Sequence, residues 1–367
     1  MSDFFRAHQA VGMTVPTYFI ESTAPNNVDD TVVVPPVLPP ELQPIDPDLA
    51  VRQIAAALAN APEPNLVVMV HGFNNPEPDV LKMYTAAARA VEADPAVRNR
   101  QGLVCVGYRW PSEKMGQPIE GTWDALPTLP TWILYAGAAL TLLPFLLLPW
   151  LGTFADHVIS IAGLTLAGLV LATALLRTIV YFRDTYRATN YGAPDLVQII
   201  RAIDGEIVRQ RGDAGPANDV QLSFIGHSMG GFVVTNTIRV LSDVFLKEVQ
   251  GLSEYGAHAA APPSPNIGNV FCLKRFVLAS PDIPAETLLS NRGNFLASSL
   301  SRFDEAYLFS NEGDEVLRQI STLANYFVFP TKHSGNKRTA CRTSALAASA
   351  SDRGAPAPGR VCPGPAR

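Results

Sequence analysis

Short apolar runs alternate with amphipathic stretches along this chain, and that alternation limits the folds it can adopt. The runs "NLVVMVHGFNN", "GLVCVGYRWP" and "DVQLSFIG" are apolar over strand length, which is typical of strands buried on both faces. The stretches "EPDVLKMYTAAARAVEAD" and "APDLVQIIRAIDGEIVRQR" have the spacing of amphipathic helices. This pattern predicts an α/β fold, a mostly parallel sheet with helices on both faces.

The remaining stretches extend the same series. We expect a first strand in "MTVPTYFIES", a loop in the Pro-rich "VVVPPVLPPELQPIDPD" and a helix in "LAVRQIAAALANA". Further along, "GGFVVTNTIRVLSDVFL" has helical spacing, and "VFCLKRFVLASPDI" and "EAYLFSNEGD" read as strands. We therefore expect one α/β body spread over most of the chain.

One block interrupts this series because it lacks charge. No charged residue lies between Asp124 and Asp156, and a second apolar run follows up to Arg177. Each run is about 20 residues long, enough for a helix to cross a ~30 Å hydrocarbon core. We therefore expect an inserted two-helix transmembrane hairpin, with the bilayer as a partner. Lys and Arg lie only on its outer flanks, which predicts a cytoplasmic body on an inner membrane.

The expected organisation has four segments. Residues 1–124 and 183–332 form the two parts of the α/β domain, and residues 125–182 form the hairpin. Residues 333–367 are rich in Ala, Arg, Pro and Gly without a helical or strand period, which predicts a disordered tail.

Composition excludes several classes of function. The net charge of −5 offers no basic field for a nucleic-acid partner. The four cysteines form no CxxC pair, and neither a metal-ligand spacing nor a dinucleotide Gly motif is present. We expect no cofactor and no metal.

The stretch "FIGHSMGG" carries the strongest chemical signal. A G-x-S-x-G motif between a buried strand and a helix predicts a sharp turn that holds Ser228 at the carboxyl edge of the sheet. Gly226 and Gly230 would leave the space that a strained turn needs, and Gly231 would let the helix pack closely. The alternative is a phosphate-binding turn or a plain bend.

The loop in "VMVHGFNN" is expected to supply a second backbone N–H donor to the site around Ser228. Backbone N–H groups of Phe73 and Met229 would form an oxyanion hole for a tetrahedral intermediate. His71 would brace this loop by hydrogen bonds rather than transfer protons. The alternative is that the loop is merely a turn.

Five stretches in order, "HGFNN", "YRWPS", "FIGHSMGG", "LASPDI" and "LFSNEGDEVL", resemble the α/β-hydrolase superfamily. Within it they resemble bacterial serine hydrolases of lipase and esterase type. The resemblance covers residues 15–330 apart from the apolar block. It implies an acyl-enzyme mechanism that uses Ser, an acid and His in that order.

The resemblance assigns the nucleophile to Ser228 and the acid to Asp314. Asp314 could instead cap a helix, and Asp282, in "SPDIP", is the other candidate acid. Only His333 follows Asp314, so it is the candidate base, or else a solvated loop histidine. A truncated or frameshifted C-terminus would leave the base elsewhere. His227 would point into the fold.

These expectations define a membrane-anchored serine hydrolase of the carboxylic-ester class, acting on a lipid or another small acylated substrate through a Ser-His-Asp mechanism. The alternative is a catalytically inactive, hydrolase-like membrane scaffold.

Overall fold

The computed structural model describes residues 4–25, 38–112, 165, 168, 179–212, 217–241, 264–283 and 302–309. The chain divides into two compact units, one of Met1–Glu113 with Asp184–Arg367 and one of Lys114–Arg183. In the second unit the described residues, 165, 168 and 179–183, are helical. The sheet and the candidate site lie in the first unit. The predicted domain boundaries remain predictions.

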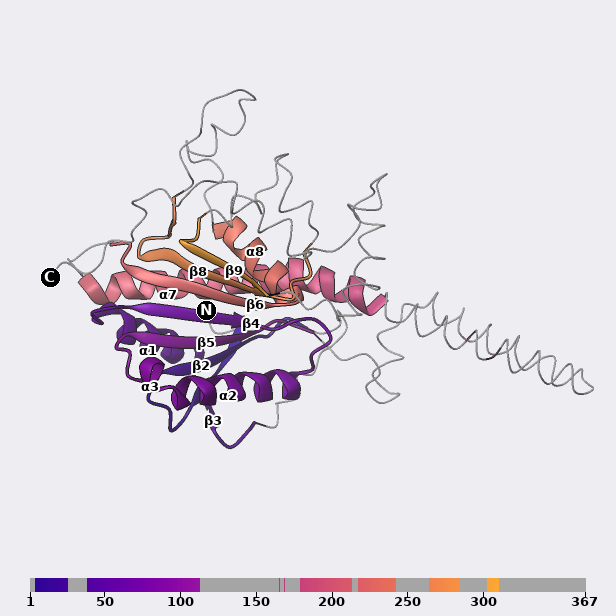
Figure 1. Cartoon of the computed structure of the whole chain (residues 1–367), viewed down its shortest axis with the longest axis horizontal. Coiled ribbons are helices and arrows are strands. Elements are labelled where there is room, and N and C mark those ends of the chain that lie inside the picture. Colours follow the sequence, from indigo (N-terminus) through magenta and orange to yellow (C-terminus); the bar gives the residue numbers. More distant parts are fainter. Residues whose placement is uncertain are drawn as a thin grey trace, which may run out of the picture. The chain divides into compact units, whose positions relative to one another are not determined.

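Nine strands of the described part form one mixed sheet, in the order β3-β1-β2-β5-β4-β6-β8-β7, with β9 paired to β8 (Figure 1). Strands β2, β5, β4, β6, β8 and β9 run parallel, whereas β1, β3 and β7 pair antiparallel with their neighbours. The strands are β1 (Phe5–Ala10), β2 (Thr17–Ser22), β3 (Leu42–Ile45), β4 (Asn65–Val70), β5 (Leu103–Arg109), β6 (Val220–His227), β7 (Asn266–Ile267), β8 (Phe271–Ala279) and β9 (Glu305–Phe309).

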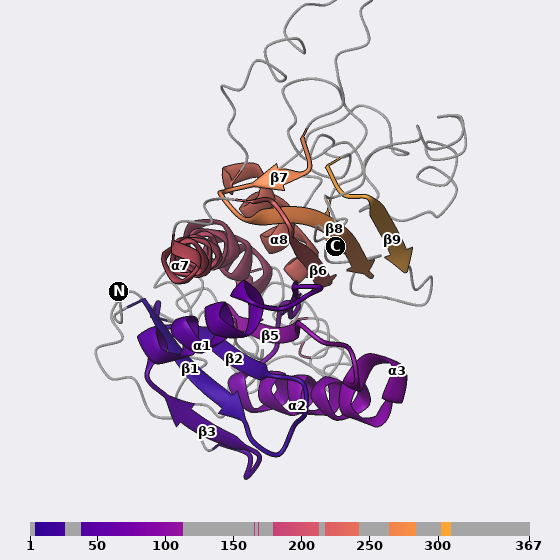
Figure 2. The ribbon, with the colours of Figure 1, turned by 90° about the vertical axis from the view of Figure 1, so that its left-hand side faces the viewer.

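Helices cover both faces of this sheet. Successive side chains of a strand point to opposite faces, and β2 shows where each helix lies. Tyr18 donates a hydrogen bond to Gln53 of α1, whereas Phe19 stacks on Tyr84 of α2. Figure 2 shows α2 across the sheet from α7. The helices are α1 (Pro47–Ala59), α2 (Glu77–Ala93), α3 (Pro95–Arg98), the π-helix η2 (Ala188–Gly192), α7 (Ala193–Arg211) and α8 (Met229–Leu241).

The parallel strands bring four chain segments to one edge of the sheet. Val70 of β4 pairs with Tyr108 of β5 and Gly226 of β6, and Gly226 pairs with Leu278 of β8. Because parallel strands end on the same side, the residues that follow each of them meet there. This carboxyl edge therefore gathers residues 71–75, 110–112, 228 and 280–283.

The sheet is mixed, because three strands that pair antiparallel with their neighbours join the parallel strands that the sequence predicted. Strand β1 was not expected, and β3 lies in a stretch predicted to be a loop. Only residues 11–16 separate β1 from β2, and so short a connection joins antiparallel strands, since a parallel pair needs a long crossover. Pro44 within β3 hid that strand in the sequence, since proline is confined to edge strands and bulges.

The predicted transmembrane hairpin is not supported, so the fold-class prediction is wrong in this part. Within the described residues no helix is both long and apolar enough to cross a bilayer. Of the segment 125–182 predicted to form the hairpin, the structure describes only residues 165, 168 and 179–182. An uncharged run spans a membrane only as one continuous helix of about 20 residues, and low charge alone does not guarantee such a helix.

Candidate active site

Ser228 occupies the turn between β6 and α8 in a strained backbone conformation. Its φ is 51°, in the left-handed region that residues other than glycine rarely adopt. Such a conformation costs roughly 1–3 kcal/mol and persists only where the surrounding structure enforces it. The residue is partly exposed at the carboxyl edge of the sheet. Ser228 thus combines backbone strain with access to solvent.

Backbone hydrogen bonds from three segments hold this turn. The Ser228 N–H donates to the Ala279 carbonyl at 2.8 Å, which ties the turn to the end of β8. The Ser228 carbonyl accepts from the N–H of Gly231 at 3.0 Å and of Asp282 at 3.1 Å. The strained residue is therefore fixed by both α8 and the loop after β8.

Glycines let the loop after β4 lie directly against the turn. A Cβ atom at Gly72 would stand 2.8 Å from the Ser228 Cβ. A Cβ atom at Gly230 would stand 2.3 Å from the Val70 carbonyl oxygen and 2.5 Å from that of His71. Both distances are shorter than real contacts allow, so the loop and the first turn of α8 touch through backbone alone.

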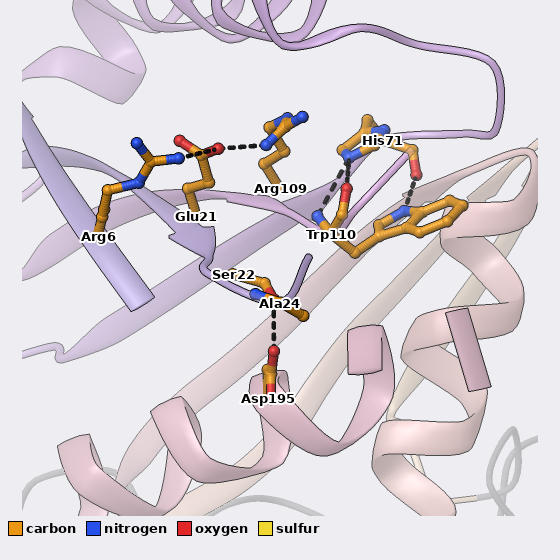
Figure 3. Close-up of polar contacts among 8 residues, drawn as sticks. All are labelled: Arg6, Glu21, Ser22, Ala24, His71, Arg109, Trp110 and Asp195. Atoms are coloured by element: carbon orange, nitrogen blue, oxygen red, sulfur yellow. Dashed lines mark hydrogen bonds and ion pairs between the residues drawn. The ribbon is translucent and has the colours of Figure 1, made fainter. Parts of the chain in front are cut away.

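His71 is fully buried and braces this loop (Figure 3). Its Nε2 accepts from the Trp110 N–H at 3.2 Å, and Nδ1, which then carries the proton, donates to the Gly72 carbonyl at 2.7 Å. The Trp110 indole stacks on the imidazole ring and donates to the His71 carbonyl at 2.9 Å. The Tyr84 hydroxyl accepts from the His71 N–H at 3.0 Å.

The electrostatic environment keeps this imidazole neutral. Burial, and next the positive charge of Arg109, lower the pKa of His71 to about 3. A ring that stays neutral and has both nitrogens engaged serves as a brace for residues 71–75, not as a proton carrier.

An ionic cluster lies on the α2 face of the same edge. Glu21 accepts from Arg6 at 3.0 Å and also pairs with Arg109 (Figure 3). Glu77 opens α2, directly after the loop, and burial, and next the Glu21 carboxylate, raise its pKa to about 7. One acid of this cluster is therefore protonated in the folded protein at mildly acidic pH.

His71 and Glu77 predict an unusual pH dependence of stability. His71 excludes a proton that the unfolded ring binds below about pH 6.5, so its contribution to the free energy of unfolding falls as pH drops from 6.5 to 3. Glu77 retains a proton that the unfolded carboxyl loses, so its contribution falls as pH rises from 4.5 to 7. The two effects oppose each other between pH 4.5 and 6.5.

The substitution Glu77→Gln removes the pH-dependent contribution of Glu77 to stability and leaves that of His71. Relative to the native chain, the free energy of unfolding of this variant should increase steadily between pH 4.5 and 7, as measured by urea titration at each pH. Gly205→Ala, whose added methyl group would meet nothing within 4 Å, serves as the control, because its effect on stability should not change with pH. A difference between Glu77→Gln and the native chain that does not change with pH would contradict the assignment.

The two expected oxyanion donors lie on segments that flank Ser228. Phe73 follows Gly72 in the loop after β4, and Met229 is the first residue of α8, with its side chain buried. The expectation for His227 is wrong, because its side chain is exposed rather than turned into the fold. The His227 ring lies beside the loop after β4, where a Cβ atom at Gly72 would stand 3.0 Å from its Nδ1.

The candidate acids and base are described only in part. Asp282 is buried, and its backbone N–H binds the Ser228 carbonyl, so this acid lies beside the turn. Asp314 and His333 lie outside the described residues, and their roles remain predictions. Among the residues that are described, no group of three or more His, Cys, Asp or Glu side chains could hold a metal ion.

Sequence reasoning missed the residues that support the loop from other elements. Three residues that are distant in the sequence hydrogen-bond to residues 71–75, namely Tyr84, Ser112 and Asp184. Ser112 follows β5 in "RWPS", and a polar residue just past a buried strand was the available signal. Asp184, within a helical stretch of mixed charge, carried none.

Comparisons of the chain with family models, with curated proteins and with solved structures find no match. The function of the chain is therefore inferred from the geometry of the carboxyl edge.

Proposed function

We propose that this protein is a serine hydrolase that cleaves carboxylic esters, with Ser228 as the nucleophile. The observation that carries the proposal is the left-handed backbone of Ser228 between a parallel strand and a helix, at the edge where α/β sheets bind ligands. A strained, accessible serine next to a braced Gly-containing loop fits a nucleophile better than a plain bend, which would not need a non-glycine residue in this conformation.

The proposed chemistry follows the arrangement of the turn and the loop. Ser228 Oγ gives its proton to the base, which we assign to His333, and forms a bond to the ester carbonyl carbon. The carbonyl electron pair moves to oxygen, where the Phe73 and Met229 N–H groups would stabilise the negative charge. The C–O bond to the alcohol breaks, the base returns the proton to it, and water repeats the steps on the acyl-enzyme.

Asp314 is the proposed orienting acid, and Asp282 is the alternative. The position of Asp282 beside the Ser228 turn keeps this alternative open. A lipid substrate was expected only because a transmembrane hairpin would hold the protein beside the bilayer. Because that hairpin is not supported, we propose only the carboxylic-ester class.

A fluorophosphonate probe tests this function. Ser228 Oγ should bond to phosphorus as fluoride leaves and the base takes the hydroxyl proton, which labels the native chain within minutes. Ser228→Ala should abolish labelling, and Ser223→Ala, which removes a buried serine of the same strand, should leave it unchanged. A folded native chain that the probe does not label would favour a hydrolase-like protein without activity.

A further inference from the structure

A second polar network, made by residues other than those around His71, holds the loop after β4. Asp184 is fully buried, and its Oδ2 accepts from the Ser112 hydroxyl at 3.1 Å and from the Asn74 N–H at 3.4 Å. The Ser112 oxygen in turn accepts from the Asn75 N–H at 3.3 Å. The Asn74 N–H is thus bound directly to the Asp184 carboxylate, and the Asn75 N–H is bound to it through the Ser112 hydroxyl.

The network acts where the loop backbone is strained. Asn74 has a φ of 60°, again in the left-handed region. The side chain of the next residue, Asn75, donates from Nδ2 to the Gly72 and Phe73 carbonyls, both at 3.2 Å. The Asn74 N–H belongs to the peptide plane that follows Phe73, and the Gly72 carbonyl belongs to the plane that carries the Phe73 N–H. Asp184 and the Asn75 side chain therefore hold the peptide planes on either side of Phe73.

The charge on Asp184 is balanced within the same buried region. Arg187 lies one helical turn away, with its Nη1 3.5 Å from Asp184 Oδ1, and is itself almost fully buried. Oδ1 of Asp184 thus faces Arg187, while Oδ2 accepts the hydrogen bonds from Ser112 and from the Asn74 N–H of the loop. An amide in place of the carboxylate would weaken both interactions but keep the shape of the side chain.

We propose that Asp184 is a positioning residue for the oxyanion hole, acting through Ser112 and the Asn74 amide to aim the Phe73 N–H at the reacting oxygen. This inference rests on the proposed function. Misaligned donors of an oxyanion hole lower kcat, because these donors stabilise the charge of the transition state and contribute little to binding of the ground state. Loss of the network should therefore lower kcat more than it changes KM.

Two substitutions test the network at different points. Ser112→Ala removes the link to Asn75 and leaves the ion pair intact, and Asp184→Asn weakens the whole network. Each should lower kcat for ester hydrolysis by roughly 10- to 100-fold with KM changed by less than about threefold. Binding of a trifluoromethyl ketone, which forms a tetrahedral oxyanion adduct, should weaken by a similar factor.

Because both act through one loop, the double variant should lose less than the product of the two single losses. The chain offers a matched control pair, Ser22 and Asp195, whose side chains hydrogen-bond and tie β2 to α7 at the same edge (Figure 3). Ser22→Ala and Asp195→Asn should destabilise the fold comparably and leave kcat near that of the native chain.

The outcomes separate this inference from the proposed function. If the native chain neither hydrolyses esters nor reacts with the fluorophosphonate, the proposed function fails. If the native chain is active but both network variants keep its kcat, the positioning role is overturned. The role is also overturned if the loss appears in KM alone, or if the control pair loses as much kcat. Should Asp184→Asn not fold, Ser112→Ala decides the question.

Discussion

Replacing Ser228 with alanine is expected to lower kcat/KM for ester hydrolysis by roughly 10⁴-fold or more while the protein stays folded. The hydroxyl oxygen forms the covalent bond in the proposed mechanism, and no remaining group can replace it. Hydrolysis of p-nitrophenyl esters of several acyl chain lengths, with circular dichroism as the fold check, measures the effect.

Ser228→Gly should be equally inactive but more stable than the native chain by about 1 kcal/mol, because glycine adopts a positive φ without steric cost. A gain in stability with a loss of activity would show that strain is maintained for function. Ser280 is the matched control, since its φ of 43° is also left-handed but it has no place in the mechanism. Ser280→Gly should gain similar stability and keep its turnover, and loss of turnover there would contradict the special role of Ser228.

Gly230→Ala is expected to destabilise the protein by about 3–5 kcal/mol or to prevent folding. The added methyl group would meet the carbonyl oxygens of Val70 and His71 at 2.3 and 2.5 Å, and both belong to backbone that cannot swing aside. Helix α8 would have to move away from β4, taking the Ser228 turn with it. Chemical denaturation, or the soluble yield if the variant does not fold, measures this cost.

Gly205→Ala is the matched control for this substitution. Gly205 lies in α7, is exposed, and a Cβ atom there would meet nothing within 4 Å. Alanine is the better helix former, so this variant should gain about 0.5–1 kcal/mol. Equal and small effects at the two positions would contradict the close contact between α8 and the loop after β4.

The central strands and their helices were predictable because their signals are local. Strand β6, the Ser228 turn and α8 lie within one continuous stretch, where a buried apolar run, a glycine pair and a helical period follow one another. Edge strand β3 was not predictable, because Pro44 argues for a loop and only pairing with β1 reveals the strand. The apolar block showed the opposite failure, in which composition suggested a span that the described helices do not support.

The candidate site was predictable only where its residues adjoin a strand end. Ser228 and the loop after β4 follow buried strands directly, so topology alone brings them to one edge. The contacts of Tyr84 and Asp184 with this loop depend on which helix faces pack against it. A charged residue in a helix is expected to be exposed to solvent until the packing is known. The inward orientation expected for His227 is wrong for a similar reason, because only the packed structure shows the residue exposed and its ring beside Gly72.

The acyl-enzyme itself offers the most direct measurement. The native chain would be mixed with a slowly hydrolysed ester, quenched in acid and digested with trypsin, and the peptide of residues 212–239 examined by fragmentation mass spectrometry. We predict that the mass of the acyl group appears on Ser228 and not on Ser223 of that peptide. An acyl group on another residue, or hydrolysis that continues in Ser228→Ala, would contradict the account.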